Sequence, residues 1–216
     1  MRLVCISDTH RKHRQLKLPP GDILIHAGDI GIEDSLTRLT EFSKWIDSLP
    51  YPHKIIIPGN HDLAIEASPL TARALLKGPG VHFLIDEEVV IDGVKFYGSP
   101  WQPWFHDWAW NAQRGEVLRK IWAKIPDDTD VLVTHGPPFG ILDEVIYGGK
   151  SVGCEELRKR VLVVKPKVHI FGHIHEGYGF FSEGGVDYIN AAILSHDGPL
   201  NPPQVIDVKP RIPSIT

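Results

Sequence analysis

The chain has 216 residues, of which 42% are hydrophobic and 23% charged, the ordinary composition of a globular protein. Its 23 basic and 27 acidic residues give a formal charge of -4, without a Lys/Arg run that resembles a nucleic-acid footprint. Two cysteines form neither a disulfide framework nor a thiolate metal set, and no stretch has the roughly 18 apolar residues of a membrane span. We therefore expect a single cytoplasmic domain over residues 1–216, without a long nucleic acid or a membrane as partner.

The predicted elements alternate between strands and helices. Short apolar, β-branched runs predict buried strands at residues 3–6, 23–27, 55–57, 131–133 and 168–171. Helical periodicity predicts helices from residue 36, capped by Asp34 or Ser35 and ended by Pro50, and over residues 70–77, 114–125 and 154–164. Turn residues predict hairpins that join 88–91 to 94–97 and 177–181 to 186–191. This order predicts an α/β fold with mixed sheets.

Seven side chains of metal-ligand type follow the carboxyl ends of the five predicted strands. They are Asp8, His10, Asp29, Asn60, His135, His173 and His175. Loops at this edge of an α/β sheet converge, so we expect the seven to meet. A lone His or Asp at a strand end is more often a capping or hydrogen-bonding residue, but seven at five strand ends favour a metal site.

Two divalent cations fit this ligand set better than one. Carboxylate, amide and imidazole without thiolate suit Mn, Fe or Zn better than Ca or Cu(I). Seven ligands exceed the needs of one tetrahedral ion, whereas two ions about 3.5–4 Å apart can share one carboxylate. We expect Asp29 to bridge them, because it stands in the Gly28-Asp29 turn, where the backbone can approach closely.

Five segments in order resemble the motifs of the calcineurin-like metallophosphoesterase superfamily. They are SDTH at 7–10, AGDI at 27–30, GNHD at 59–62, THGPP at 134–138 and GHIH at 172–175. The resemblance implies an αββα sandwich with two mixed β-sheets flanked by helices, and a dinuclear phosphoesterase site. It implies one ion on Asp8, His10, Asp29 and His175, and a second on Asp29, Asn60, His135 and His173.

A closer resemblance is to the metallophosphoesterase-domain-containing (MPPED) subfamily. It rests on GSPWQPWF at 98–105, VGCEEL at 152–157, FGHIHEGYG at 171–179 and NPPQVIDV at 201–208. The chain departs from that pattern by being shorter between residues 62 and 81 and by having GNHD where vertebrate members have GNHE. The resemblance implies hydrolysis of cyclic nucleotides, 2′,3′- or 3′,5′-, or of similar small phosphodiesters.

The expected mechanism uses His61 as general acid. Two cations, Mn²⁺ first and Fe, Zn, Ni or Mg as alternatives, would activate a metal-bridging hydroxide to attack phosphorus. His61 follows the ligand Asn60 directly and could protonate the leaving oxygen. Its orienting carboxylate could be Asp62, Glu33 or Asp34, among which the sequence does not choose.

Candidate substrate contacts come from two segments. His13 could touch the substrate phosphate, although a surface role is equally compatible with its position. Trp101, Trp104 and His106 lie in an aromatic, Pro-containing segment that could stack a nucleobase. The alternative is that this segment anchors a loop on the core.

The other functions that fit the sequence are a broad-specificity phosphomonoesterase or nuclease, and a non-catalytic scaffold that retains the metal site. A scaffold would be expected to have lost ligands or the acid, and this chain retains all of them. The oligomeric state has no signature in the sequence.

Overall fold

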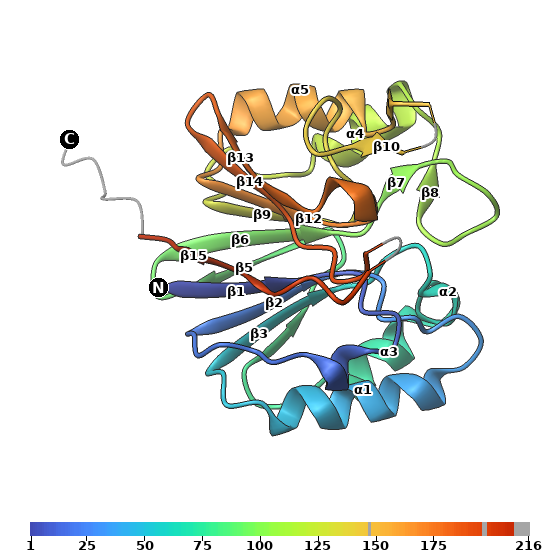
Figure 1. Ribbon diagram of the computed structural model, residues 1–216, viewed down its shortest axis with the longest axis vertical. Coiled ribbons are helices and arrows are strands. Elements are labelled where there is room, and N and C mark those ends of the chain that lie inside the picture. The colour runs from blue at the N-terminus through green and yellow to red at the C-terminus, as the bar shows by residue number, and fades with distance from the viewer. Residues whose placement is uncertain (147, 196–197, 210–216) are drawn as a thin grey trace.

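The computed structural model describes residues 1–146, 148–195 and 198–209, which form four layers in the order helices, sheet, sheet, helices (Figure 1). In spatial order, the first sheet contains β15 (Gln204–Asp207), β1 (Arg2–Ile6), β2 (Ile23–Ala27), β3 (His53–Ile57) and β4 (Val81–Phe83). Its strands are parallel except for β15. The sheet is therefore mixed, as predicted.

The second sheet contains six strands. They are β13 (Gly179–Glu183), β14 (Val186–Asn190), β12 (Val168–Phe171), β9 (Val131–Thr134), β6 (Val94–Ser99) and β5 (Glu87–Ile91). The edge strands β13 and β5 are antiparallel to their neighbours, and the other four are parallel. All parallel strands in both sheets point their carboxyl ends towards the same side of the molecule, on the right in Figure 1.

Helices cover the outer face of each sheet. The first sheet is covered by α1 (Leu36–Ser48), α2 (Leu63–Ala67) and α3 (Pro69–Leu75), and the second by α4 (Glu116–Trp122) and α5 (Glu155–Val164). Because both faces of each sheet are covered, the central strands are buried throughout and their sequences are almost continuously apolar. One apolar cluster lies between the sheets, and two more lie beneath the helices.

The predicted αββα architecture is confirmed, with small differences at the element ends. Ser35 rather than Asp34 caps α1, because its hydroxyl accepts a hydrogen bond from the Thr37 amide at 3.2 Å. Helix α4 is shorter than the predicted 114–125, since Gly115 has a φ of 80°, which a right-handed helix does not allow. The 3₁₀ turn η2 (His175–Gly177) replaces the start of the second predicted hairpin.

Several short elements lack a sequence signal and were not predicted. They are the edge strands β4 and β15, the helix α2, the 3₁₀ turn η1 (His13–Gln15), and the two-residue pairs β7 (Gln102–Pro103) with β8 (Asn111–Ala112) and β10 (Glu144–Val145) with β11 (Lys150–Ser151). Over the described residues, none of the helices combines the length and apolar character that crossing a bilayer requires.

Candidate metal centre

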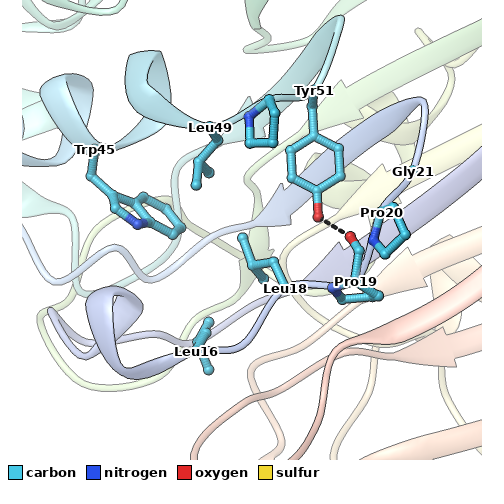
Figure 2. A pocket seen from close by; sticks show the side chains of 9 residues that line it. Leu16, Leu18, Pro19, Pro20, Gly21, Trp45, Leu49 and Tyr51 are labelled. Carbon is cyan, nitrogen blue, oxygen red and sulfur yellow. Dashed lines mark hydrogen bonds between the residues drawn. The ribbon is translucent and has the colours of Figure 1, made fainter.

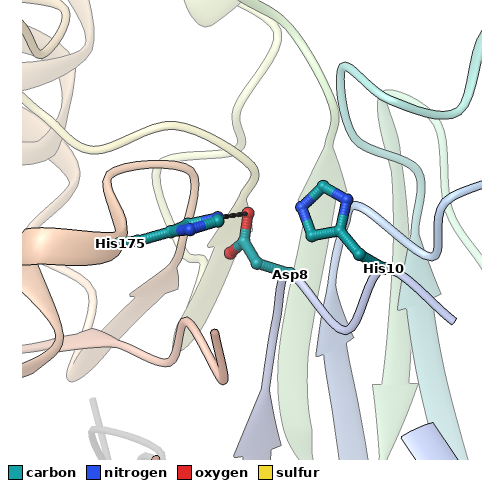
Figure 3. A group of neighbouring side chains, drawn as sticks. All are labelled: Asp8, His10 and His175. Carbon is teal, nitrogen blue, oxygen red and sulfur yellow. Dashed lines mark ion pairs between the residues drawn. The ribbon is translucent and has the colours of Figure 1, made fainter. Parts of the chain in front are cut away.

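The seven predicted ligands follow β1, β2, β3, β9 and β12, six of them in loops and His175 at the start of η2. Asp8 faces His175, with its Oδ1 3.4 Å from the imidazole Nε2, and His10 stands on the opposite side of Asp8 (Figure 3). Asp8 also forms a second compact group with Asp29 and His135; in each of the two groups, one ligand atom per residue lies within 4.8 Å of the others. The two sheets thus bring side chains from both halves of the chain to one place.

Asp29 lies between two imidazoles. Its Oδ2 is 3.4 Å from His10 Nε2, and its Oδ1 is 3.4 Å from His135 Nε2. Two ligand atoms bound at about 2.1 Å to one tetrahedral ion are about 3.4 Å apart, so each spacing suits a shared cation. Each of the two Asp29 carboxylate oxygens therefore faces a different imidazole at a spacing that a shared cation could bridge.

Unsatisfied atoms at the site fit cation binding. Asp8 Oδ1 and His10 Nε2, both able to bind a cation, are buried without a hydrogen-bond partner among the described residues. The Ala27 carbonyl, 3.0 Å from His135 Nδ1, can only accept a hydrogen bond, so that nitrogen donates and Nε2 keeps its lone pair. This lone pair lies 2.6 Å from Asn60 Oδ1, and a bound cation would satisfy both atoms as ligands.

The electrostatics of the site also favour cations. Burial, followed by the nearby charges of Asp8 and Asp62, raises the pKa of Asp29 well above its ordinary value. Burial lowers the pKa of His10 to about 4 and that of His173 to about 3. These imidazoles are therefore neutral near pH 7, the form that binds metals. A cation would offset the cost of keeping Asp29 ionised.

His173 completes the group on the side of His135. The two rings are 5.1 Å apart, and the His173 amide donates to Asp8 Oδ2 at 2.9 Å. Positive φ values occur at Asp8 (53°), His10 (39°), Asp29 (57°) and His173 (67°). Such conformations in residues other than glycine cost energy and cluster at functional sites.

Asp62 holds two of the ligand loops together. Its carboxylate accepts hydrogen bonds from the amides of Ile30, Gly31, Ile32 and Gly59, at 2.8–3.2 Å. With both oxygens used in this way, Asp62 fixes the backbone beside Asp29 and Asn60. It is not available to orient His61.

Glu33 is the carboxylate that reaches His61. Its Oε1 lies 3.2 Å from His61 Nδ1, whereas Asp34 forms an ion pair with Arg38 at 3.2 Å. The His61 amide donates to Asp29 Oδ1 at 2.8 Å, and its ring centre is 4.9 Å from that of His10. His61 therefore stands beside the predicted ligands with its Nδ1 towards Glu33.

Comparison with known proteins agrees with this arrangement. The profile of the calcineurin-like phosphoesterase family matches residues 1–177. The chain belongs to this family. Metallophosphoesterase domain-containing protein 1 of Homo sapiens is 41% identical over 230 residues, which cover 96% of this chain and 71% of that protein. A UPF0046 protein of Caenorhabditis elegans is 37% identical over 204 residues, 89% of this chain and 69% of that protein.

Solved structures share the fold of this phosphoesterase at low sequence identity. The protein TT1561 of Thermus thermophilus superposes with a TM-score of 0.60 at 13% identity, covering 88% of each chain. A further crystal structure gives a TM-score of 0.65 at 17% identity, covering 88% of this chain and 89% of the other. Family membership makes the protein a metal-dependent phosphoesterase.

The aromatic loop, residues 101–110, places Trp108 against the candidate acid. The centres of the His61 and Trp108 rings are 4.3 Å apart, and Phe105 lies 5.4 Å from Trp108. Trp104 and Phe105 are 55% and 51% exposed, so their faces are open to a ligand. The sequence drew attention to this segment but did not single out Trp108.

Two predicted substrate contacts of the phosphoesterase lie elsewhere. His13 is buried against Phe42 and Trp45, with ring centres 5.2 and 4.6 Å away, and is therefore a core residue. Trp101 donates to Asp86 at 3.2 Å and packs edge-on against Trp110, so it anchors the aromatic loop. His106 is exposed, with its ring 5.0 Å from Trp108, and stays a candidate.

An apolar pocket of about 520 Å³ lies far from the ligands in the fold. Its walls include Trp45, Leu18 and the Tyr51 ring, whose hydroxyl donates to the Pro19 carbonyl (Figure 2). Pro19 and Tyr51 precede β2 and β3, so the pocket is at the amino ends of strands whose carboxyl ends carry the ligands. It contains no group suited to phosphate chemistry.

Replacing Gly172 with alanine should damage the metal centre. The added Cβ would be 2.0 Å from Asp8 Oδ2 and 2.3 Å from Ser7 Oγ, distances that force the carboxylate to move. We expect a loss of stability of about 1–3 kcal/mol and reduced metal content, measured by denaturation and elemental analysis. Gly136→Ala is the matched control, since its Cβ would make only ordinary contacts at 3.8 and 3.9 Å. Equal metal content in the two variants would contradict the role of Gly172.

Proposed function

We propose that this chain binds two divalent cations, Mn²⁺ first among them, and hydrolyses small phosphodiesters, with cyclic nucleotides as the substrate class. The observation that carries the proposal is the orientation of Asp29, whose two oxygens face His10 and His135 at 3.4 Å each. One set would hold a cation through Asp8, His10, Asp29 and His175. The other would use Asp29, Asn60, His135 and His173.

The protein's own groups have distinct tasks in this reaction. Bound cations would supply Lewis acidity towards the phosphate and towards water. His61, oriented by Glu33 through Nδ1, presents Nε2 to the leaving oxygen and donates a proton to it. The Trp108 ring against His61 limits the movement of the imidazole and keeps water from that side.

The substrate class is supported by the aromatic loop and by the resemblance to MPPED proteins. Phe105 and His106 are exposed with their rings next to Trp108, and Trp104 is exposed in the same loop. Every nucleobase offers a π face for stacking. Because the rings lie next to the acid, a stacked base would leave its phosphate near the ligands. A broad phosphomonoesterase or nuclease is the alternative enzyme, and a non-catalytic scaffold is the alternative outside catalysis.

A substrate panel tests the proposal. Metal-loaded protein should hydrolyse 2′,3′- or 3′,5′-cyclic nucleotides faster than a chromogenic monoester, with metal stoichiometry measured on the same sample. A chromogenic diester and single-stranded RNA serve as comparisons. Faster monoester hydrolysis would favour the phosphomonoesterase and RNA cleavage the nuclease, while metal-loaded protein inert on every compound would favour the scaffold.

His61→Ala should separate catalysis from metal binding. Because His61 is the proposed acid and no ligand, turnover should fall by about 10²- to 10⁴-fold while the metal content stays at the wild-type value. Glu33→Gln should lower turnover less, since the amide can still accept a hydrogen bond from Nδ1. Arg38→Gln, which removes the partner of Asp34, is the control. Loss of metal from the His61 variant would count against the assignment.

Phe105→Ala should weaken the binding of nucleotides. Stacking contributes about 1–3 kcal/mol per base, so KM for a cyclic nucleotide should rise about 5-fold or more with little change in kcat. KM for an alkyl phosphodiester without a base should stay unchanged. Phe180, which is 55% exposed on β13, provides the control substitution. If KM rises equally for both substrates, the loop does not recognise the base.

A further inference from the structure

Two fully buried histidines outside the ligand set occupy equivalent places in the two sheets. His26 lies on β2, and its Nε2 is 2.9 Å from the Thr9 hydroxyl. His169 lies on β12, and its Nε2 is 2.8 Å from the Thr134 hydroxyl. In both cases the histidine contacts a threonine at the neighbouring strand's carboxyl end. Thr9 is in the loop after β1, and Thr134 is the last residue of β9.

Both threonines adjoin proposed ligands. Thr9 stands between Asp8 and His10, and Thr134 directly precedes His135. The Thr134 hydroxyl donates to the Gly136 carbonyl at 2.8 Å, so it must accept its second hydrogen bond from His169 Nε2–H. The Thr134–Gly136 hydrogen bond therefore joins the two residues that flank His135, and His169 holds the Thr134 hydroxyl in that position.

The loop around Thr9 requires support. Asp8, His10 and Arg11 have φ values of 53°, 39° and 68°, which side chains other than glycine adopt only when their surroundings hold them. The His26–Thr9 hydrogen bond ties this loop to β2 through side chains. Backbone hydrogen bonds, such as that from the His10 amide to the Asp29 carbonyl, also hold the loop. Loss of the contact would free the loop to move the two ligands that flank Thr9.

Each of the two histidines has one ring nitrogen without a hydrogen-bond partner in the described part of the chain. The Nδ1 atoms of His26 and His169 are buried without a hydrogen-bond partner among the described residues, and an unpaired buried polar atom is unfavourable. Burial lowers the pKa of both rings to about 3, so they add no charge beside the ligands. The unpaired Nδ1 atoms destabilise the fold, and we take this as an indication that the Nε2 contacts with Thr9 and Thr134 hold the ligand loops.

We propose that His26 and His169 are positioning residues, each of which sets the affinity of one cation site. His26 acts through Thr9 on the site of Asp8 and His10. His169 acts through Thr134 on the site that includes His135. The inference rests on the proposed two-cation function, and it assigns a separate support to each cation.

Calorimetric titration of metal-free protein with Mn²⁺ tests the assignment. His10→Ala and Asn60→Ala identify which binding step belongs to which site. His26→Phe should raise the Kd of the His10-dependent step by about 10- to 100-fold and leave the other step unchanged, and His169→Phe should do the converse. His→Gln at either position keeps a donor near Nε2 and should restore most of the affinity.

Thr9→Val removes the His26–Thr9 hydrogen bond from the other partner, and Thr134→Val removes the His169–Thr134 hydrogen bond together with the one to the Gly136 carbonyl. Both substitutions keep the side-chain volume nearly constant, and they replace the Phe variants if these do not fold. Melting of the metal-free variants separates a general loss of stability from a loss of affinity. Unchanged Kd values in variants whose melting temperature falls would overturn the positioning role. It would also be overturned if either substitution raised the Kd of both Mn²⁺-binding steps by the same factor. Wild-type protein that binds fewer than two Mn²⁺ would instead overturn the proposed function, and this inference with it.

Discussion

The burial of two carboxylates at one point is the constraint on which the structure of the site depends. Asp8 and Asp29 follow adjacent parallel strands of the first sheet and are almost inaccessible to solvent. The imidazoles of His135 and His175 come from the second sheet. Because each proposed ligand set draws on both sheets, cations that neutralise the carboxylates would also join the two halves of the sandwich. Cation binding should therefore stabilise the packing of sheet on sheet.

Buried polar side chains hold the ligand loops from behind. Asp62 gathers the amides of the loops after β2 and β3, and Asn190 donates to the carbonyls of Ile174 and Leu142 at 2.8 and 3.3 Å. Asn190 thereby fixes the loop that carries His173 and His175. Such contacts satisfy backbone groups that irregular loops would otherwise leave buried and unpaired. Asp62 and Asn190 thus fix the positions of the ligand loops, although neither side chain is itself a proposed metal ligand.

The convergence of the ligands was predictable from the sequence because parallel strands align the loops at their carboxyl ends. The strands themselves could be recognised as apolar runs. The sequence could not predict that Glu33 rather than Asp62 contacts His61. This depends on which carboxylate accepts the hydrogen bonds of the loop amides. His13 has a polar surrounding sequence, RKHRQ, yet the turn η1 directs its ring onto α1. Trp101 and Trp108 look alike in sequence, and only tertiary packing makes one an anchor and the other a neighbour of the acid.

The attachment of the aromatic loop has a consequence for specificity. The Ala109 amide donates to the Asn60 carbonyl at 3.0 Å, and the Trp110 amide donates to Glu66 at 2.7 Å on the helix after His61. The loop proposed to select the substrate is therefore hydrogen-bonded to the segment that carries Asn60 and His61. A change in the length of the loop would move His61 together with the stacking rings, whereas a side-chain change at an exposed ring would not. Under the proposed function, ring substitutions at constant loop length would therefore change the substrate preference of this chain while leaving His61 in place.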